Sequence, residues 1–90
     1  MRLRDKIAII TAAGSGAGRA RALIFSKEGA EVVVGDIDSK GGKETVEMIK
    51  DRGGDAVFVQ IDVGKVDDAR RLIDTTVETY GKINVLWNHA

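Results

Sequence analysis

Short apolar runs alternate along this chain with segments in which apolar residues recur every three or four positions, and glycines or Asp/Ser clusters separate the two kinds of segment. Apolar runs of about four to eight residues are typical of buried strands, whereas the wider spacing is typical of amphipathic helices. The pattern therefore predicts the element order βαβαβαβ. The predicted strands are Ile7–Thr11, Glu31–Asp36, Ala56–Ile61 and Ile83–Asn88.

The first two predicted strands are almost continuously apolar, as expected of central parallel strands that are covered on both faces. The third carries a polar position, Gln60, which favours an edge of the sheet. Right-handed crossovers then predict the strand order 3-2-1-4, with the last crossover helix on the face opposite the first two. We expect one α/β domain over residues 1–90, a partial Rossmann-type fold with three layers around a parallel sheet.

Three glycines, Gly29, Gly53 and Gly81, each follow a helical segment and predict its end, because glycine readily adopts the left-handed conformation that closes a last turn. Ser39 is the candidate N-cap of the second helix, and we expect this helix to begin late because Gly41 follows closely. Apolar spacing predicts which helix positions face the core. They are Ala20, Leu23 and Ile24 in the first helix, Val46 and Ile49 in the second, and Val66, Ala69, Ile73, Val77 and Tyr80 in the third.

Composition narrows the range of partners. The 14 basic residues balance the 14 acidic ones, so we expect neither nucleic-acid nor membrane binding. The chain has no cysteine and a single histidine, His89, which excludes disulfides and thiolate metal sites and predicts no metal. The apolar run Ile7–Ile10 is too short for a signal segment or a membrane span. We therefore expect a cytoplasmic protein.

The segment from Thr11 to Ala20 has the composition of a phosphate-binding turn between a strand and a helix. Its glycines allow close backbone approach, and the free N–H groups and dipole of the helix N-terminus favour a pyrophosphate. The common G-x-G-x-x-G spacing is absent, because Arg19 and Arg21 stand where the third glycine would fall. The arginines at positions 19, 21, 70 and 71 are expected to be solvated.

Thr11, Gly16 and Gly18 resemble the T-G-x-x-x-G-x-G signature of the short-chain dehydrogenase/reductases. Asp36-Ile37-Asp38 also resembles the family and lies where a carboxylate accepts hydrogen bonds from the adenosine ribose and repels a 2′-phosphate. Ser15 stands where NADP-preferring members tend to carry a basic residue. The resemblance therefore implies NAD as the cofactor, with NADP less favoured.

Two later stretches are similar to the same family. Asp62-Val63 resembles the pair that contacts the adenine, and Asn88-His89-Ala90 resembles the start of the N-N-A-G motif. The resemblance implies that the dinucleotide contacts Thr11, Gly14, Ser15, Gly16, Ala17, Gly18, Asp36, Ile37, Asp62, Val63, Asn88, His89 and Ala90.

Three positions depart from the family pattern: Ala12 replaces the first glycine, Trp87 a smaller aliphatic residue and His89 the second asparagine. Ala12 predicts weaker binding of the dinucleotide, because its Cβ would crowd the turn. Trp87 is interpreted as a packing residue.

The resemblance places the family's catalytic serine, its Tyr-x-x-x-Lys pair and its catalytic asparagine beyond residue 90 in chain order. Tyr80 does not match that tyrosine, because Asn84 stands four residues further on, where the lysine would be. We assign no catalytic residue and expect this chain alone to be inactive.

Two functions remain open. The first is the NAD-binding portion of an oxidoreductase whose family transfers hydride between a nicotinamide and an alcohol or carbonyl compound. The second is a non-catalytic Rossmann-like module that assembles through the edge strand Ile83–Asn88, as a homo-oligomer or with a complementary chain.

Overall fold

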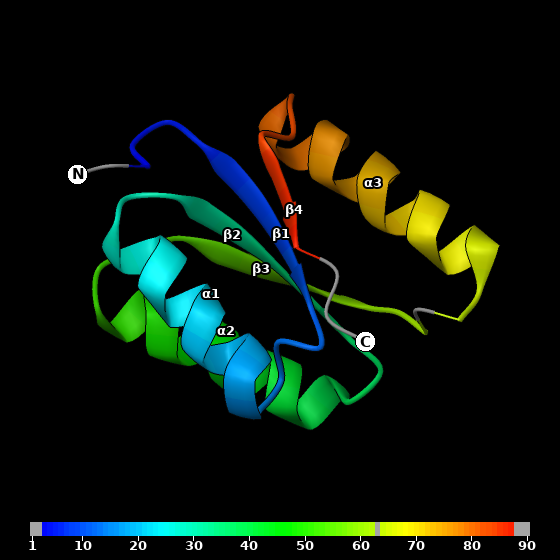
Figure 1. The fold of residues 1–90 in the computed structure, drawn as a ribbon, viewed down its shortest axis with the longest axis horizontal. Coiled ribbons are helices and arrows are strands. Elements are labelled where there is room, and N and C mark those ends of the chain that lie inside the picture. Colours follow the sequence, from blue (N-terminus) through cyan, green and yellow to red (C-terminus); the bar gives the residue numbers. More distant parts are fainter. Residues whose placement is uncertain (1–2, 63, 88–90) are drawn as a thin grey trace.

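The computed structural model describes residues 3–62 and 64–87. It contains four strands and three helices in the predicted alternating order (Figure 1). These elements are β1 (Ile7–Thr11), α1 (Gly16–Lys27), β2 (Glu31–Asp36), α2 (Ser39–Asp51), β3 (Ala56–Gln60), α3 (Val66–Tyr80) and β4 (Val85–Trp87).

The strands form one parallel sheet in the order β3-β2-β1-β4, which confirms the predicted topology. β1 pairs with β2 along its whole length, whereas β4 pairs with β1 over only three residues, Val85–Trp87. β4 begins two residues later than predicted, at Val85, and Asn84 before it meets the start of β1. The Asn84 N–H donates to the Ile7 carbonyl, and its Oδ1 accepts from the Ile7 N–H, both at 2.9 Å.

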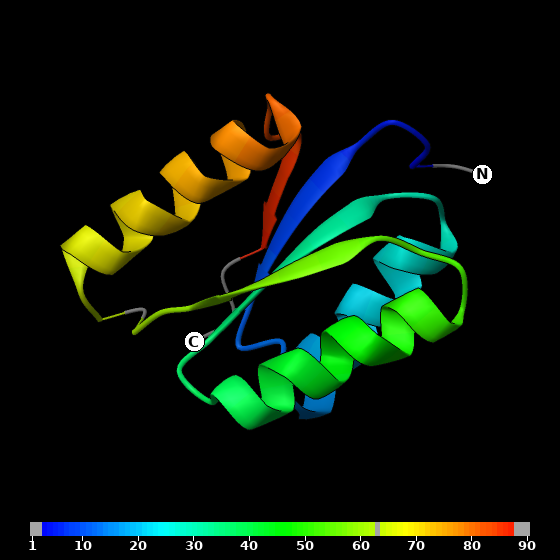
Figure 2. The ribbon, with the colours of Figure 1, turned by 180° about the vertical axis from the view of Figure 1, so that it is seen from behind.

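Helices cover the two faces of the sheet unequally (Figures 1 and 2). α1 and α2 lie together on one face, over a core that includes Ile10, Val34 and Ile49. α3 lies alone on the other face, over a smaller core that includes Ile9 and Leu72. Alternate residues of a strand point to opposite faces, so neighbours such as Ile9 and Ile10 belong to different cores.

The predicted core face of α1 is correct for Leu23, which packs partly buried against the core, and wrong for the other two positions. Ala20 is exposed, and Ile24 keeps 58% of its surface. The helix instead buries Gly18 and Ala22, one turn apart. These small residues allow the helix backbone to approach β1 and β2 closely, which the pattern of large apolar residues does not indicate.

The predicted core face of α3 is correct for Tyr80, which packs partly buried against the core, and wrong for the other four positions. Leu72 and Thr76 are the buried residues of this helix, and the buried Thr76 hydroxyl donates to the Leu72 carbonyl at 2.8 Å. The predicted positions Val66, Ile73 and Val77 are 77%, 41% and 46% exposed to solvent. The apolar stripe of α3 is thus rotated away from the sheet and left largely in solvent.

The start of α2 also differs from its prediction. Asp38, not Ser39, is the N-cap, and its side chain accepts a hydrogen bond from the Gly41 N–H. The helix includes Gly41 and begins without delay, because this cap supports its first turn. The helix ends agree with prediction, since Gly29, Gly53 and Gly81 all adopt positive φ. No helix in the described part of the chain is long and apolar enough to cross a membrane.

Candidate dinucleotide site

The glycine loop, residues 12–18, connects β1 to α1 at the carboxyl edge of the sheet. It turns through two residues with positive φ, Ala12 at +54° and Gly16 at +55°. Ser15 has the extended backbone of an N-cap, but its hydroxyl makes no capping bond within the described chain. Ser15, Gly16 and Ala17 are exposed, so the first turn of α1 presents backbone N–H groups at the surface.

Gly18 allows α1 to begin directly against the loop. A Cβ at this position would lie 2.0 Å from the Ala12 carbonyl oxygen and 2.7 Å from its carbon. Both atoms belong to the backbone and have little freedom to move away. This close approach explains physically why glycine is needed at position 18.

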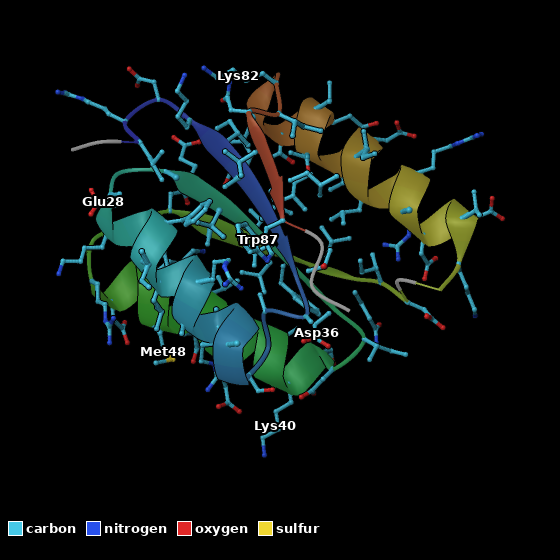
Figure 3. The ribbon with its side chains drawn as sticks, viewed as in Figure 1. Glu28, Asp36, Lys40, Met48, Lys82 and Trp87 are labelled. Atoms are coloured by element: carbon cyan, nitrogen blue, oxygen red, sulfur yellow. The ribbon has the colours of Figure 1, made fainter. Side chains whose placement is uncertain are left out.

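Asp36 ends β2 and reaches the same loop. One carboxylate oxygen, Oδ2, accepts the Gly14 N–H at 2.8 Å, and the other, Oδ1, accepts the Asp38 N–H at 3.0 Å. Figure 3 shows the Asp36 side chain near the start of α1, whereas Glu28 lies at the C-terminal end of that helix. A carboxylate offers about four acceptor positions, so these two bonds orient the group and leave it able to accept ligand hydroxyls.

Arg19 was expected to be solvated, and this expectation is wrong. Its side chain is 25% exposed and crosses from α1 to the start of α2. The guanidinium donates to the carbonyl oxygens of Gly14 at 2.6 Å and Gly41 at 3.1 Å, and to the Thr45 hydroxyl at 2.9 Å. Sequence spacing alone could not show this, because the acceptors are backbone carbonyls and a threonine 26 positions away.

The pattern of the short chain dehydrogenase family matches residues 6–90. The chain belongs to this family. An uncharacterized oxidoreductase from Thermotoga maritima is 46% identical over 90 residues, which are 100% of this chain and 35% of that protein. Tropinone reductase-like 1 from Erythroxylum coca is 40% identical over 89 residues, which are 99% of this chain and 32% of the relative.

Solved structures show the same relationship. A hydroxysteroid dehydrogenase from Escherichia coli superposes with a TM-score of 0.95 at 37% identity, covering 97% of this chain and 37% of that one. A short chain dehydrogenase/reductase from Burkholderia phymatum, solved in complex with NAD, gives a TM-score of 0.91 at 32% identity, covering 96% and 31%. The chain therefore spans about a third of the length of these relatives.

The family-type residues, those that the family resemblance implies as dinucleotide contacts, lie mostly at one edge of the sheet. Thr11, Gly14, Ser15, Gly16, Ala17, Gly18, Asp36 and Ile37 all lie at the carboxyl edge, in the glycine loop and at the ends of β1 and β2. Asp62 follows β3, and its Oδ1 accepts the Gly64 N–H at 2.9 Å. Ile37 keeps 64% of its surface exposed. Val63, Asn88, His89 and Ala90 lie outside the described residues.

Trp87 makes a contact that the sequence analysis missed. The Arg21 guanidinium lies 3.9 Å from the centroid of the indole ring, which is within the range of a cation–π interaction. Arg21 was also expected to be solvated, yet its Nη1 is buried and has no hydrogen-bond partner within the described chain. The Trp87 carbonyl accepts from the Thr11 hydroxyl at 3.4 Å, which links the ends of β4 and β1.

Tyr80 lies at the amino edge, away from the glycine loop. Its hydroxyl donates to Asp55 Oδ2 at 3.3 Å, immediately before β3. Burial, together with the negative charges of Asp55 and Glu31, raises the pKa of Tyr80 above its usual range. A hydroxyl that holds its proton this firmly exchanges it poorly near neutral pH.

A cleft opens at the amino edge, between the C-terminal ends of α1 and α2. It is lined by Leu23, Ser26, Lys27 and Arg52, among others. None of the family-type residues lies there, and the oriented carboxylate and exposed amides are at the other edge. Among the described residues, no group of acidic, cysteine or histidine side chains could hold a metal ion. The carboxyl edge is therefore the candidate site.

Proposed function

We propose that this chain forms a single dinucleotide-binding unit, the NAD-binding portion of a short-chain dehydrogenase/reductase. The observation that carries the proposal is the oriented Asp36 carboxylate beside the exposed first turn of α1. The NAD complex of the similar Burkholderia phymatum protein supports it.

The residues present fit an NAD molecule. The Gly16 and Ala17 amides, at the positive end of the α1 dipole, would hold the pyrophosphate. Asp36 would accept the adenosine ribose hydroxyls and would repel a 2′-phosphate, which favours NAD over NADP. The bound nicotinamide would supply the acceptor or donor of a hydride.

The parent reaction that we propose is hydride transfer between this nicotinamide and an alcohol or carbonyl substrate. These ninety residues are proposed to bind the cofactor without turnover. Tyr80 is committed to Asp55, and the described part of the site has no other group suited to relay a proton to a carbonyl.

A titration with NADH tests the proposal. Trp87 is the only tryptophan, and it lies at the carboxyl end of β4, so bound NADH is expected to quench its emission and to give a matching heat in calorimetry. Asp36→Ala should weaken NADH binding about tenfold, because it removes charge-assisted hydrogen bonds. Asp67→Ala, which changes an exposed acidic residue on α3, is the matched control and should leave binding unchanged. Absence of both quenching and heat would contradict the proposal.

The second candidate is a non-catalytic assembly module, and one observation favours it. Ile73 and Val77 of α3 are exposed, as is Leu86 of the edge strand β4. Leu86 pairs in register with Ile9, which belongs to the core beneath α3. Apolar side chains are thus exposed both on α3 and on the edge strand beside it. Exposed apolar surfaces of this kind pair with another copy or a complementary chain.

Light scattering tests this candidate. If the surface mediates self-association, the chain is a dimer or larger, and Ile73→Glu should convert it to a monomer. The control is Ile24→Glu, a more exposed apolar position on α1, which should leave the oligomer intact. A monodisperse monomer that binds NADH would reject self-association and retain the first candidate.

A further inference from the structure

Arg19 joins three separate parts of the fold through one guanidinium. Nη2 donates to Gly14 in the glycine loop and to Gly41 in the first turn of α2, while Nε donates to Thr45 one turn further along α2. Glu44 adds a distant ionic contact at 3.8 Å. The planar fork of arginine suits such a set of acceptors, whereas a lysine ammonium cannot reproduce it.

Thr45 completes the connection from inside the fold. It is fully buried, and its hydroxyl accepts from Arg19 while lying 2.7 Å from the Ala13 carbonyl and 3.2 Å from the Gly41 carbonyl. Two successive carbonyls of the loop, those of Ala13 and Gly14, are thereby tied to α2. A buried carbonyl without a donor is costly, so these bonds determine how the loop backbone lies.

Two glycines allow the loop and α2 to come this close. A Cβ on Gly41 would lie 2.5 Å from the Gly14 carbonyl oxygen, and a Cβ on Gly14 would lie 2.7 Å from Asp36 Oδ2. Gly14 is therefore enclosed between Asp36 and the first turn of α2. Its N–H is held by Asp36 and its C=O by Arg19.

We propose that Arg19 is a positioning residue for cofactor discrimination, because its hold on the Gly14 carbonyl keeps the Gly14 N–H in place and so orients the Asp36 carboxylate. This inference rests on the proposed function, in which Asp36 selects NAD. Arg19 does not touch the cofactor in this proposal. Loss of its fork allows Gly14 to move, and Asp36 then loses one of the two amides that hold it.

We expect the substitution of Arg19 to change the preference for NADH over NADPH, rather than to weaken the binding of both equally. NADH uses the oriented Asp36, whereas NADPH does not, so weakened orientation reduces NADH binding more than NADPH binding. Arg19→Met should raise the NADH dissociation constant about tenfold, the effect of losing charge-assisted hydrogen bonds. The ratio of the NADPH to the NADH dissociation constant should fall by a similar factor.

The experiment measures both dissociation constants by calorimetry for the wild type, Arg19→Met, Arg19→Lys and Arg70→Met. Arg19→Lys keeps the positive charge without the fork and should also lower the ratio. Arg70→Met changes an exposed arginine on α3 and should leave the ratio unchanged. Circular dichroism checks that each variant is folded, and Arg19→Lys carries the test if Arg19→Met is not.

A double-mutant cycle asks whether Arg19 acts through Asp36. In an Asp36→Ala background, Arg19→Met should no longer change the ratio, because the group that it orients is gone. An equal loss of NADH and NADPH affinity in Arg19→Met overturns the inference and identifies a direct phosphate contact or a general structural role. A wild-type ratio in Arg19→Lys also overturns it, since charge alone would then suffice.

Failure of the inference can be told apart from failure of the proposed function. A wild-type chain that does not bind NADH, or that binds NADPH equally well, contradicts the proposed function. A wild-type chain that prefers NADH, together with variants that keep this preference, contradicts only the role of Arg19.

Discussion

The two faces of the sheet carry similar apolar strand residues, but helices cover one face much more completely than the other. On one face, two helices enclose the core, and Arg19 and Thr45 tie the glycine loop to α2. On the other face, α3 buries Leu72 and Thr76 but leaves Ile73 and Val77 in solvent. An apolar stripe on a helix thus shows where burial is possible, and only the neighbouring elements decide whether it occurs.

The largest effect is expected in the glycine loop, on the enclosed face. Gly18→Ala should lower the free energy of unfolding by about 3 kcal/mol or more, because its Cβ would overlap the Ala12 backbone. Gly16→Ala is the matched control in the same loop. Nothing lies within 4 Å of its Cβ position, so it should cost only about 1 kcal/mol for its positive φ. Urea unfolding measures both, and equal costs would contradict the steric argument.

A pair of isoleucine truncations compares the two faces directly. Ile49→Ala on α2 removes a fully buried side chain and should cost about 3 kcal/mol. Ile73→Ala on α3 removes one that is 41% exposed and should cost less than about 1 kcal/mol. Chemical denaturation of the monomer checks the difference. A similar cost at both positions would show that the α3 stripe is covered in solution.

At Ala12 we expect a substitution that stabilises the fold, by a smaller amount than the losses above. Alanine at a φ of +54° is strained, whereas glycine adopts this conformation readily. Ala12→Gly should therefore raise the free energy of unfolding by about 0.5–1 kcal/mol, the relief of strain less the added entropy of the unfolded chain. Ala17→Gly in the first turn of α1 is the control and should destabilise the fold. A thermal melt in which Ala12→Gly unfolds earlier would refute the strain.

The smallest expected effect on the free energy of unfolding is at Tyr80, whose hydroxyl attaches the end of α3 to Asp55. It appears only at alkaline pH. The raised pKa of Tyr80 means that the folded state holds this proton more firmly than the unfolded chain, whose tyrosine pKa is about 10. Stability is fully present below that pH and should decline as the pH rises above it. Tyr80→Phe should remove this part of the decline, which unfolding curves between about pH 9 and 11 can detect. An identical decline in both proteins would show that Tyr80 does not contribute.

The candidate site could be predicted from the sequence only where its residues act through the backbone or through their place at a strand end. Gly16, Gly18 and Asp36 belong to such positions, and the structure brings all three to the carboxyl edge. The hydrogen bonds from Arg19 to Gly41 and Thr45 and the Arg21–Trp87 contact could not be predicted. Both join residues that are distant in sequence. An arginine in a sequence also gives no sign of whether its guanidinium contacts solvent or a protein carbonyl.

The sequence by itself determined the element order, the parallel sheet, its strand order and the helix ends. These features follow from short-range causes: apolar periodicity, the handedness of crossovers, and glycines at positive φ. The tertiary structure alone decided which helix faces are buried. Gly18 and Ala22 turn α1 toward the sheet because they allow close approach, and α3 is oriented by Leu72 rather than by its longest apolar stripe. Burial depends on the surfaces that meet, and those surfaces belong to elements far apart in the chain.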